Sequence, residues 1–163
     1  MKILVLQLKP FGDVFLSTSL TTPLRERFPN ACIHYLSVGA YTDVLENHPH
    51  VSSVIRLWGE KGIFLYINAL LLIPLVRLRR YDLVIDSQNS TITRLITILS
   101  RGRQRIGYEG KKFSSYLTAQ APAGECGPPY SAFHRLNLLH PLGIRPEKIR
   151  MLYSIKRESE EFR

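Results

Sequence analysis

Short apolar runs alternating with longer segments of helical periodicity constrain the fold of this chain more than any other feature. Each run of four to six apolar residues predicts a buried strand, and the periodic segments between the runs predict helices. Parallel strands need a crossover connection, so the alternation predicts an α/β fold: a Rossmann-like parallel sheet with helices on both faces. The predicted strands are residues 3–8, 32–37, 53–57, 82–86 and 105–108, and the predicted helices are residues 13–28, 41–47, 62–80, 91–100 and about 130–142.

Length and charge narrow the class of protein. The 163 residues are 45% hydrophobic, which suits one globular domain. Lys and Arg number 22 against 13 Asp and Glu, and the resulting net charge of +9 favours an anionic partner. No RNA- or DNA-binding motif accompanies the charge, so no nucleic-acid partner is expected. Two cysteines without a CxxC spacing indicate neither a disulfide framework nor a zinc site.

The first strand–helix junction carries the most chemical information. It lacks the three glycines of a dinucleotide-binding fingerprint, so NAD binding is disfavoured. It does hold Lys9, Gly12 and Asp13 where a strand of an open α/β sheet ends, which is the edge where such sheets bind ligands. Asp13 has two interpretations that do not exclude each other: a helix N-cap, or a general base that takes a proton from a substrate hydroxyl.

Polar residues also follow the fourth predicted strand. Ser87 and Gln88 have the groups to hydrogen-bond a bound ligand, and the alternative is that they cap the next helix. Arg94 lies about a turn into that helix. Together with Lys9, it is a candidate for binding an anionic ligand at this edge of the sheet.

Several segments, in order along the chain, resemble the glycosyltransferase family 9, the ADP-heptose:lipopolysaccharide heptosyltransferases. The likeness covers essentially residues 1–155. The family's H-x-V-x-R stretch aligns its His with Tyr130 and its Arg with His134. The segments that carry the resemblance are KILVLQLKPFGDV, RERFPNA, HPHV, YDLVID with Gln88, RQRIGY, and Leu138-Leu139 with LGI at residues 142–144.

The resemblance implies the N-terminal domain of a two-domain GT-B enzyme, with residues 1–150 as an acceptor-binding domain. Residues 151–163 would begin the linker to a C-terminal donor-binding domain that is missing here, after a possible strand at 151–155. The resemblance makes Asp13 the base of an inverting transfer of heptose from ADP-heptose to the lipopolysaccharide inner core. The candidate acceptor contacts are then Lys9, Gly12, Ser87, Gln88 and Arg94, with Ser87 and Gln88 placed to hydrogen-bond sugar hydroxyls and the two cations to hold carboxylates or phosphates. The resemblance implies no metal or other cofactor. The chain alone is then expected to be inactive, and the alternative is a non-catalytic module that binds anionic saccharides.

The predicted helix at residues 62–80 is more apolar than a helix with one buried face needs to be. We expect it to pack against the sheet or the missing half. A second hypothesis is that it docks on an anionic membrane surface. The apolar run at residues 62–76 is shorter than the roughly 20 residues that span a bilayer. No signal peptide is evident, and the expected location is the cytoplasm, at the inner face of the inner membrane if the helix docks.

Overall fold

Parallel strands form one sheet in the computed structural model, which describes residues 1–8, 10–59, 62–110, 112–122 and 131–152. Within these residues the sheet has six strands, and every neighbouring pair is parallel. The strands are β1 (Lys2–Leu6), β2 (Cys32–Val38), β3 (Ser53–Leu57), β4 (Leu83–Asp86), β5 (Gln104–Tyr108) and β6 (Ala119–Ala121). Their order across the sheet is β3-β2-β1-β4-β5-β6. The Rossmann-like parallel sheet is therefore confirmed.

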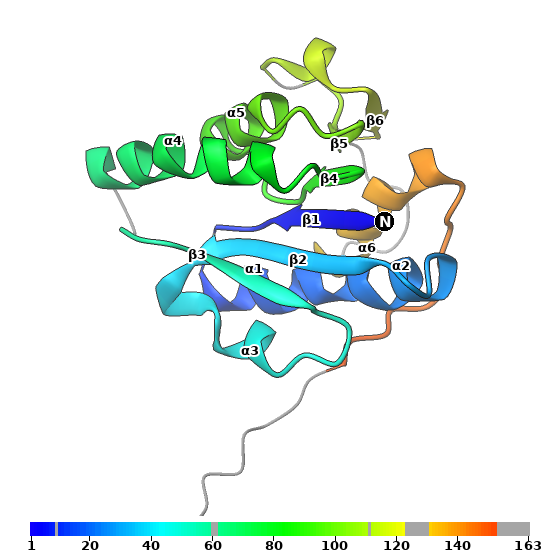
Figure 1. The fold of residues 1–163 in the computed structure, drawn as a ribbon. Helices are drawn as coiled ribbons and strands as arrows, with labels where there is room; N and C mark the ends of the chain where they lie inside the picture. Colours follow the sequence, from blue (N-terminus) through cyan, green and yellow to red (C-terminus); the bar gives the residue numbers. More distant parts are fainter. Residues whose placement is uncertain (9, 60–61, 111, 123–130, 153–163) are drawn as a thin grey trace, which may run out of the picture.

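Helices cover both faces of the sheet (Figure 1). Alternate residues of β1 point to opposite faces: Ile3 packs with α1, α2, α3 and α6, and Leu4 packs with α4 and α5. The α-helices are α1 (Phe11–Ser17), α2 (Thr21–Arg27), α3 (Asp43–Glu46), α4 (Gly62–Leu78), α5 (Thr91–Leu99) and α6 (Ser131–Leu136). Short 3₁₀ segments are η1 (Thr18–Leu20), η2 (Gly39–Tyr41), η3 (Ser114–Tyr116) and η4 (Asn137–Leu142).

The strand order reverses between β1 and β4. The chain runs from β1 outward through β2 to β3, then crosses back along α4 to β4 on the other side of β1. The carboxyl ends of β1 and β4 lie side by side, with Leu6 paired to Asp86. The Ser87 N–H donates to the Leu6 carbonyl at 3.1 Å, which extends the contact past the strand ends. Open α/β sheets form their ligand crevice at such a switch point.

The structure departs from the sequence prediction in a few elements. The helix predicted over residues 13–28 is α1, η1 and α2 in succession, and the last helix tightens into η4 before Gly143, whose left-handed φ of 73° ends it as expected. The strand β6 was not predicted, because three residues carry no readable periodicity. The possible strand at 151–155 is not seen at residues 151–152, and 153–163, most of the predicted linker, lie outside the described residues.

His48, which follows α3, is a source of acid sensitivity. Its side chain is 3% exposed and its Nδ1 accepts a hydrogen bond from the His50 N–H at 3.1 Å. Burial, aided by the nearby His50, lowers the pKa of His48 from 6.5 to about 4. The folded state therefore binds the proton less readily than the unfolded state. The stabilisation is complete above pH 6.5 and is lost as the pH falls toward 4.

We predict that the free energy of unfolding falls by up to about 3 kcal/mol between pH 7 and pH 4 through His48 alone. His48→Asn keeps an acceptor for the His50 N–H but does not titrate, so urea unfolding of this variant should depend less on pH. His140→Asn, at a partly exposed position, serves as the comparison. Burial also lowers the pKa of His140, so this variant should reduce the pH dependence too, but by less than His48→Asn does. If the free energy of unfolding falls equally between pH 7 and pH 4 in His48→Asn and in the parent chain, His48 is not the source of the acid sensitivity.

Candidate functional site

Asp13 lies beside the switch point, where the loops that follow β1 and β4 meet; we call this junction the crevice. It is the third residue of α1, and its N–H donates to the Pro10 carbonyl at 2.9 Å. The N-cap position belongs to Pro10, so the interpretation of Asp13 as the N-cap is wrong. Its side chain is 36% exposed. The carboxylate is therefore free of a capping bond and open to solvent on one side.

Arg135 of α6 connects Asp13 to both strands of the crevice. Its buried guanidinium donates from Nη2 to Asp13 Oδ1. Nη1 donates to Gln7 Oε1 at 2.8 Å and to Ser87 Oγ at 3.2 Å. A planar guanidinium with several donors fixes such acceptors in relative position. Four segments, the ends of β1 and β4 and the helices α1 and α6, are thereby joined at one cation.

Gln88 forms a hydrogen bond between the loop after β4 and the loop after β1. Its Oε1 accepts a hydrogen bond from the Leu8 N–H. The helix α5 is capped instead by Ser90, whose Oγ accepts from the Thr93 N–H at 3.3 Å in a capping box. The interpretation of Ser87 and Gln88 as helix caps is therefore wrong, and both residues line the junction of β1 and β4.

The backbone at Gly12 is open to an approaching ligand. Gly12 is exposed, and a Cβ built on it meets no atom within 4 Å among the described residues. Gly12 therefore adds no side chain beside the Asp13 carboxylate. Lys9, the cation predicted beside it, lies outside the described residues.

Arg94 lies inside the protein. Its side chain is 2% exposed, and its Nε lies 3.1 Å from Asp86 Oδ2. Nη2 donates to the Asn89 side chain and to the Tyr108 carbonyl, the latter at 3.4 Å. Burial raises the pKa of Asp86, a shift that the Asn89 N–H and the Arg94 charge oppose. This placement supports a structural role that joins β4, α5 and β5, and it gives no support to the predicted acceptor contact of Arg94.

The position of Gly107 in β5 has no room for a side chain, because the Arg94 guanidinium packs against its backbone. A Cβ at this position would lie 2.9 Å from Nη1 and 3.0 Å from Cζ of Arg94. We predict that Gly107→Ala lowers the free energy of unfolding by about 1–3 kcal/mol, because the guanidinium is held by Asp86 and cannot retreat. Denaturant unfolding measures the change. Gly12→Ala, with open space at its Cβ, is the control, and an equal cost at both positions would contradict this explanation.

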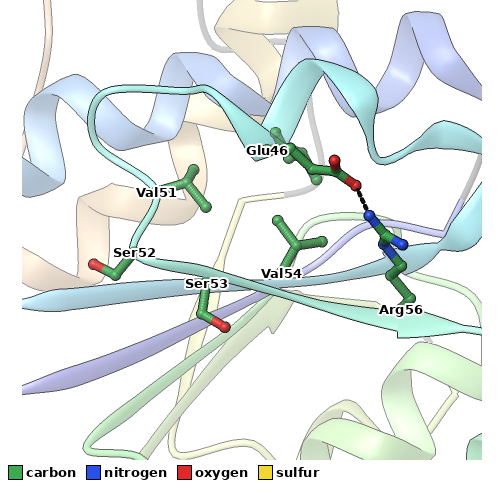
Figure 2. Close-up of a pocket in the computed structure, with 7 residues that line it drawn as sticks. Glu46, Val51, Ser52, Ser53, Val54 and Arg56 are labelled. Carbon is green, nitrogen blue, oxygen red and sulfur yellow. Dashed lines mark hydrogen bonds and ion pairs between the residues drawn. The ribbon is translucent and has the colours of Figure 1, made fainter.

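A separate pocket of about 260 Å³ lies at the β3 edge of the sheet. Figure 2 shows Glu46 of α3 and Arg56 of β3 reaching toward each other across it, and the two side chains form an ion pair. Its other lining residues come from the segment at 45–54. None of them belongs to the network around Arg135, so this pocket is not part of the candidate site.

Three residues of the crevice and its supports were not predicted as site residues: Gln7, Asn89 and Arg135. The resemblance aligned a family arginine with His134, whereas the structure brings the next residue, Arg135, to the site. Gln7 had a readable signal, since it is a polar residue at the end of a buried apolar strand and is itself fully buried.

Among the described residues, no group of three or more His, Cys, Asp or Glu side chains is placed to hold a metal ion.

The fold is similar to solved glycosyltransferase structures. A glycosyl transferase family 9 structure from Veillonella parvula matches with a TM-score of 0.80 and 22% identity, over 94% of this chain and 44% of that chain. The E. coli ADP-heptose lps heptosyltransferase II matches with a TM-score of 0.78 and 23% identity, over 96% and 47%. E. coli heptosyltransferase WaaC with ADP-2-deoxy-2-fluoro heptose matches with a TM-score of 0.74 and 16% identity, over 91% and 50%.

These matches concern the fold. No family model and no curated protein matches the sequence. The chain spans about half the length of the solved structures that it resembles. The expected glycosyltransferase architecture is nevertheless confirmed: the chain has the fold of about half of a family 9 glycosyltransferase.

Proposed function

We propose that the chain forms the acceptor-binding half of an inverting heptosyltransferase. The enzyme transfers a heptose from ADP-heptose to the inner core of lipopolysaccharide. The observation that carries the proposal is the Asp13 carboxylate, which is partly exposed at the switch-point crevice and held there by Arg135. The likeness in fold to two E. coli heptosyltransferases supports the choice of reaction.

Asp13 acts in this mechanism as the general base. Arg135 holds Oδ1, which leaves Oδ2 to face the acceptor. The carboxylate takes the proton of an acceptor hydroxyl as its oxygen forms a bond to the anomeric carbon of the heptose. The bond from that carbon to the diphosphate oxygen breaks at the same time, and ADP leaves with the electron pair. Attack opposite the leaving group inverts the anomeric centre.

The acceptor lies in the proposal over Gly12 and between the two crevice loops. The missing side chain at Gly12 lets a sugar approach the backbone beside Asp13. The Gln88 amide retains donors for sugar hydroxyls, since its contact to the Leu8 N–H uses its oxygen atom as the acceptor. Ser87 is only 4% exposed, so it supports the site through Arg135 rather than by contacting the sugar. Lys9 supplies a cation for an anionic acceptor. Arg94 is left out of the acceptor site because it is buried.

Donor binding belongs in this proposal to a second domain beyond residues 1–163, as in an enzyme of two similar halves. The chain covers 44–50% of the solved glycosyltransferases. Arg135 and Asp13 then meet the donor at the carboxyl edge of this sheet. Stabilisation of the departing diphosphate comes from that second domain, so the 163-residue chain alone should not transfer sugar.

We predict that Arg135 acts as a positioning residue for Asp13. Arg135→Lys keeps the charge but loses the fork that serves Gln7, Ser87 and Asp13 at once. The kcat for transfer should fall about tenfold, with KM for the acceptor little changed. Arg135→Met should in addition lower the free energy of unfolding by about 2–4 kcal/mol, since it leaves Gln7 Oε1 without its buried partner.

The matched control is Arg145→Lys, a change at an exposed arginine beyond the last helix. It should leave both kcat and stability at the parent values. A loss of stability in Arg135→Lys with an unchanged kcat would show a purely structural arginine and contradict the positioning role.

The proposed reaction is tested with the native polypeptide, meaning the chain as the cell makes it. It is incubated with ADP-heptose and deacylated inner-core saccharide, and the product is followed by mass spectrometry and NMR. We expect the addition of one heptose with inversion of the anomeric configuration. Saturable binding of the saccharide with no transfer by the native polypeptide would overturn the enzymatic proposal and leave a saccharide-binding module.

A further inference from the structure

The outward face of α4 is apolar along the whole helix. No charged residue occurs in residues 62–76, and the exposed positions recur at intervals of three and four residues, so they form one stripe. Leu71, near the middle, is 69% exposed. We call this surface the α4 stripe, and its large apolar members are Ile63, Phe64, Ile67, Leu70, Leu71, Leu75 and Leu78.

The opposite face of α4 already supplies the packing that the sheet requires. Ala69, Ile73 and Val76 are buried there, and Ala69 and Val76 belong to the core shared with α5. Figure 1 shows α4 on the outside of the sheet beside α5. The α4 stripe therefore points away from the domain. A contiguous exposed apolar surface that runs the length of a helix marks a site for a partner or a membrane.

Charges at one end of the stripe indicate the kind of surface it meets. Between residues 62 and 85 there is a single carboxylate, Asp82, against Arg77, Arg79 and Arg80. Arg77 Nε donates to the Leu99 carbonyl at 2.6 Å, which brings the end of α4 next to the exposed Arg101 and Arg103. An apolar stripe that ends in a cluster of arginines complements a bilayer surface with anionic headgroups.

The other end of α4 lies on the side of the candidate site. The helix begins after β3, at the carboxyl edge of the sheet, where the candidate site of Asp13 also lies. Trp58, the residue directly after β3 at the same edge, is 70% exposed. Tryptophan has an apolar ring and a polar N–H and is enriched where hydrocarbon meets water.

We infer that the α4 stripe with Trp58 docks the protein on an anionic lipid bilayer, with α4 lying in the plane of the membrane interface. The inference deepens the proposed function and rests on it, since a lipid-anchored saccharide acceptor lies on such a surface. Docking would hold the crevice of Asp13 beside the membrane. Among the described residues, no helix is long and apolar enough to cross the bilayer, and an interfacial helix does not need to be.

The extent of the stripe favours a bilayer over the donor domain as its occupant. The donor must reach Asp13 at the carboxyl edge, so its domain sits over that edge. A helix of 17 residues is about 25 Å long. The stripe runs along the whole helix to Leu78. Leu78 lies five residues before β4 begins, and therefore toward the amino edge of the sheet, opposite the carboxyl edge. A flat surface alongside the helix covers the whole stripe, whereas a domain seated over the carboxyl edge covers only its beginning.

The test is co-sedimentation of the native polypeptide with vesicles of phosphatidylcholine and phosphatidylglycerol at low salt. We expect binding that weakens with salt and with removal of phosphatidylglycerol. Leu71→Glu should lower the partition coefficient at least tenfold, because it places a carboxylate in the stripe. Tyr116→Glu, the same change at an exposed aromatic residue of η3, is the matched control and should bind as the parent does.

Three outcomes would overturn the inference. One is an unchanged partition coefficient in Leu71→Glu. Another is vesicle binding by the 163-residue chain but not by the native polypeptide, which would mean that another part of the native protein covers the stripe. A third is a dimer in analytical ultracentrifugation that Leu71→Glu dissociates, which would assign the stripe to a second copy. Transfer to deacylated, soluble saccharide separates the two proposals, since Leu71→Glu should leave that rate unchanged.

Discussion

Replacing Asp13 by Asn is expected to lower the kcat for heptose transfer by about 10²–10⁴-fold. The amide has nearly the shape of the carboxylate, and its oxygen still accepts the hydrogen bond from Arg135. It cannot take the proton of an acceptor hydroxyl. The loss should therefore appear in kcat, with the KM of the acceptor close to the parent value. The buried Arg135 guanidinium loses its counter-charge in this variant, so the free energy of unfolding should also fall, by about 1–3 kcal/mol. Steady-state kinetics and denaturant unfolding of the native polypeptide measure both.

Asp82→Asn is the matched control for this experiment. Asp82 precedes β4 at the opposite edge of the sheet, where its Oδ2 accepts a hydrogen bond from the Lys2 N–H at 2.8 Å. The same chemical change there should leave kcat within about twofold of the parent. Transfer by Asp13→Asn at the parent rate would show that no proton passes through Asp13, and the proposed mechanism would be wrong.

Replacing Arg94 by Met is expected to lower the free energy of unfolding by about 3–5 kcal/mol. The variant keeps most of the buried volume but leaves Asp86, which is fully buried, without the cation at 3.1 Å. It also removes the donor to the Asn89 side chain, which helps to hold the left-handed φ of 61° at Asn89. Urea or thermal unfolding measures the change.

A double variant separates the charge from the packing. Asp86→Asn combined with Arg94→Met removes both charges, and the new amide oxygen still accepts the Asn89 N–H. This double variant should be at least about 1 kcal/mol more stable than Arg94→Met alone. Arg103→Met, at a side chain that is 86% exposed, should change stability by less than about 0.5 kcal/mol. A double variant no more stable than Arg94→Met would contradict the view that the uncompensated Asp86 charge dominates the loss.

Much of the fold was predictable because a parallel sheet is buried on both faces. Its central strands are then nearly continuous apolar runs, and residues 3–6 and 83–85 are of this kind. The order of the strands across the sheet was not predictable in the same way, so the position of the switch point between β1 and β4 came from the structure. The end of the last helix was predictable because Gly143 suits a left-handed residue. The short edge strand β6 has too few residues to show a pattern.

The candidate site was only partly predictable, because its contacts join residues far apart in the chain. Asp13 and Gly12 stand out at a strand–helix junction that can be read locally. The partner of Asp13 lies 122 residues away, in a helix where Arg135 resembles any surface arginine. Arg94 was predicted to face an acceptor, because its helix position gives no sign of the buried Asp86 beside it. Burial and pairing of charges are properties of the assembled sheet.

The most direct test of the central claim is an amide NMR titration of the 163-residue chain with deacylated inner-core saccharide. If the acceptor binds in the crevice, the signals of Gly12, Asp13, Ser87 and Gln88 should shift and saturate together. Signals around the pocket of Glu46 and Arg56 should stay in place. Saturable shifts confined to that pocket, or no shifts in the crevice at saccharide concentrations that support transfer, would contradict the assignment of the acceptor site.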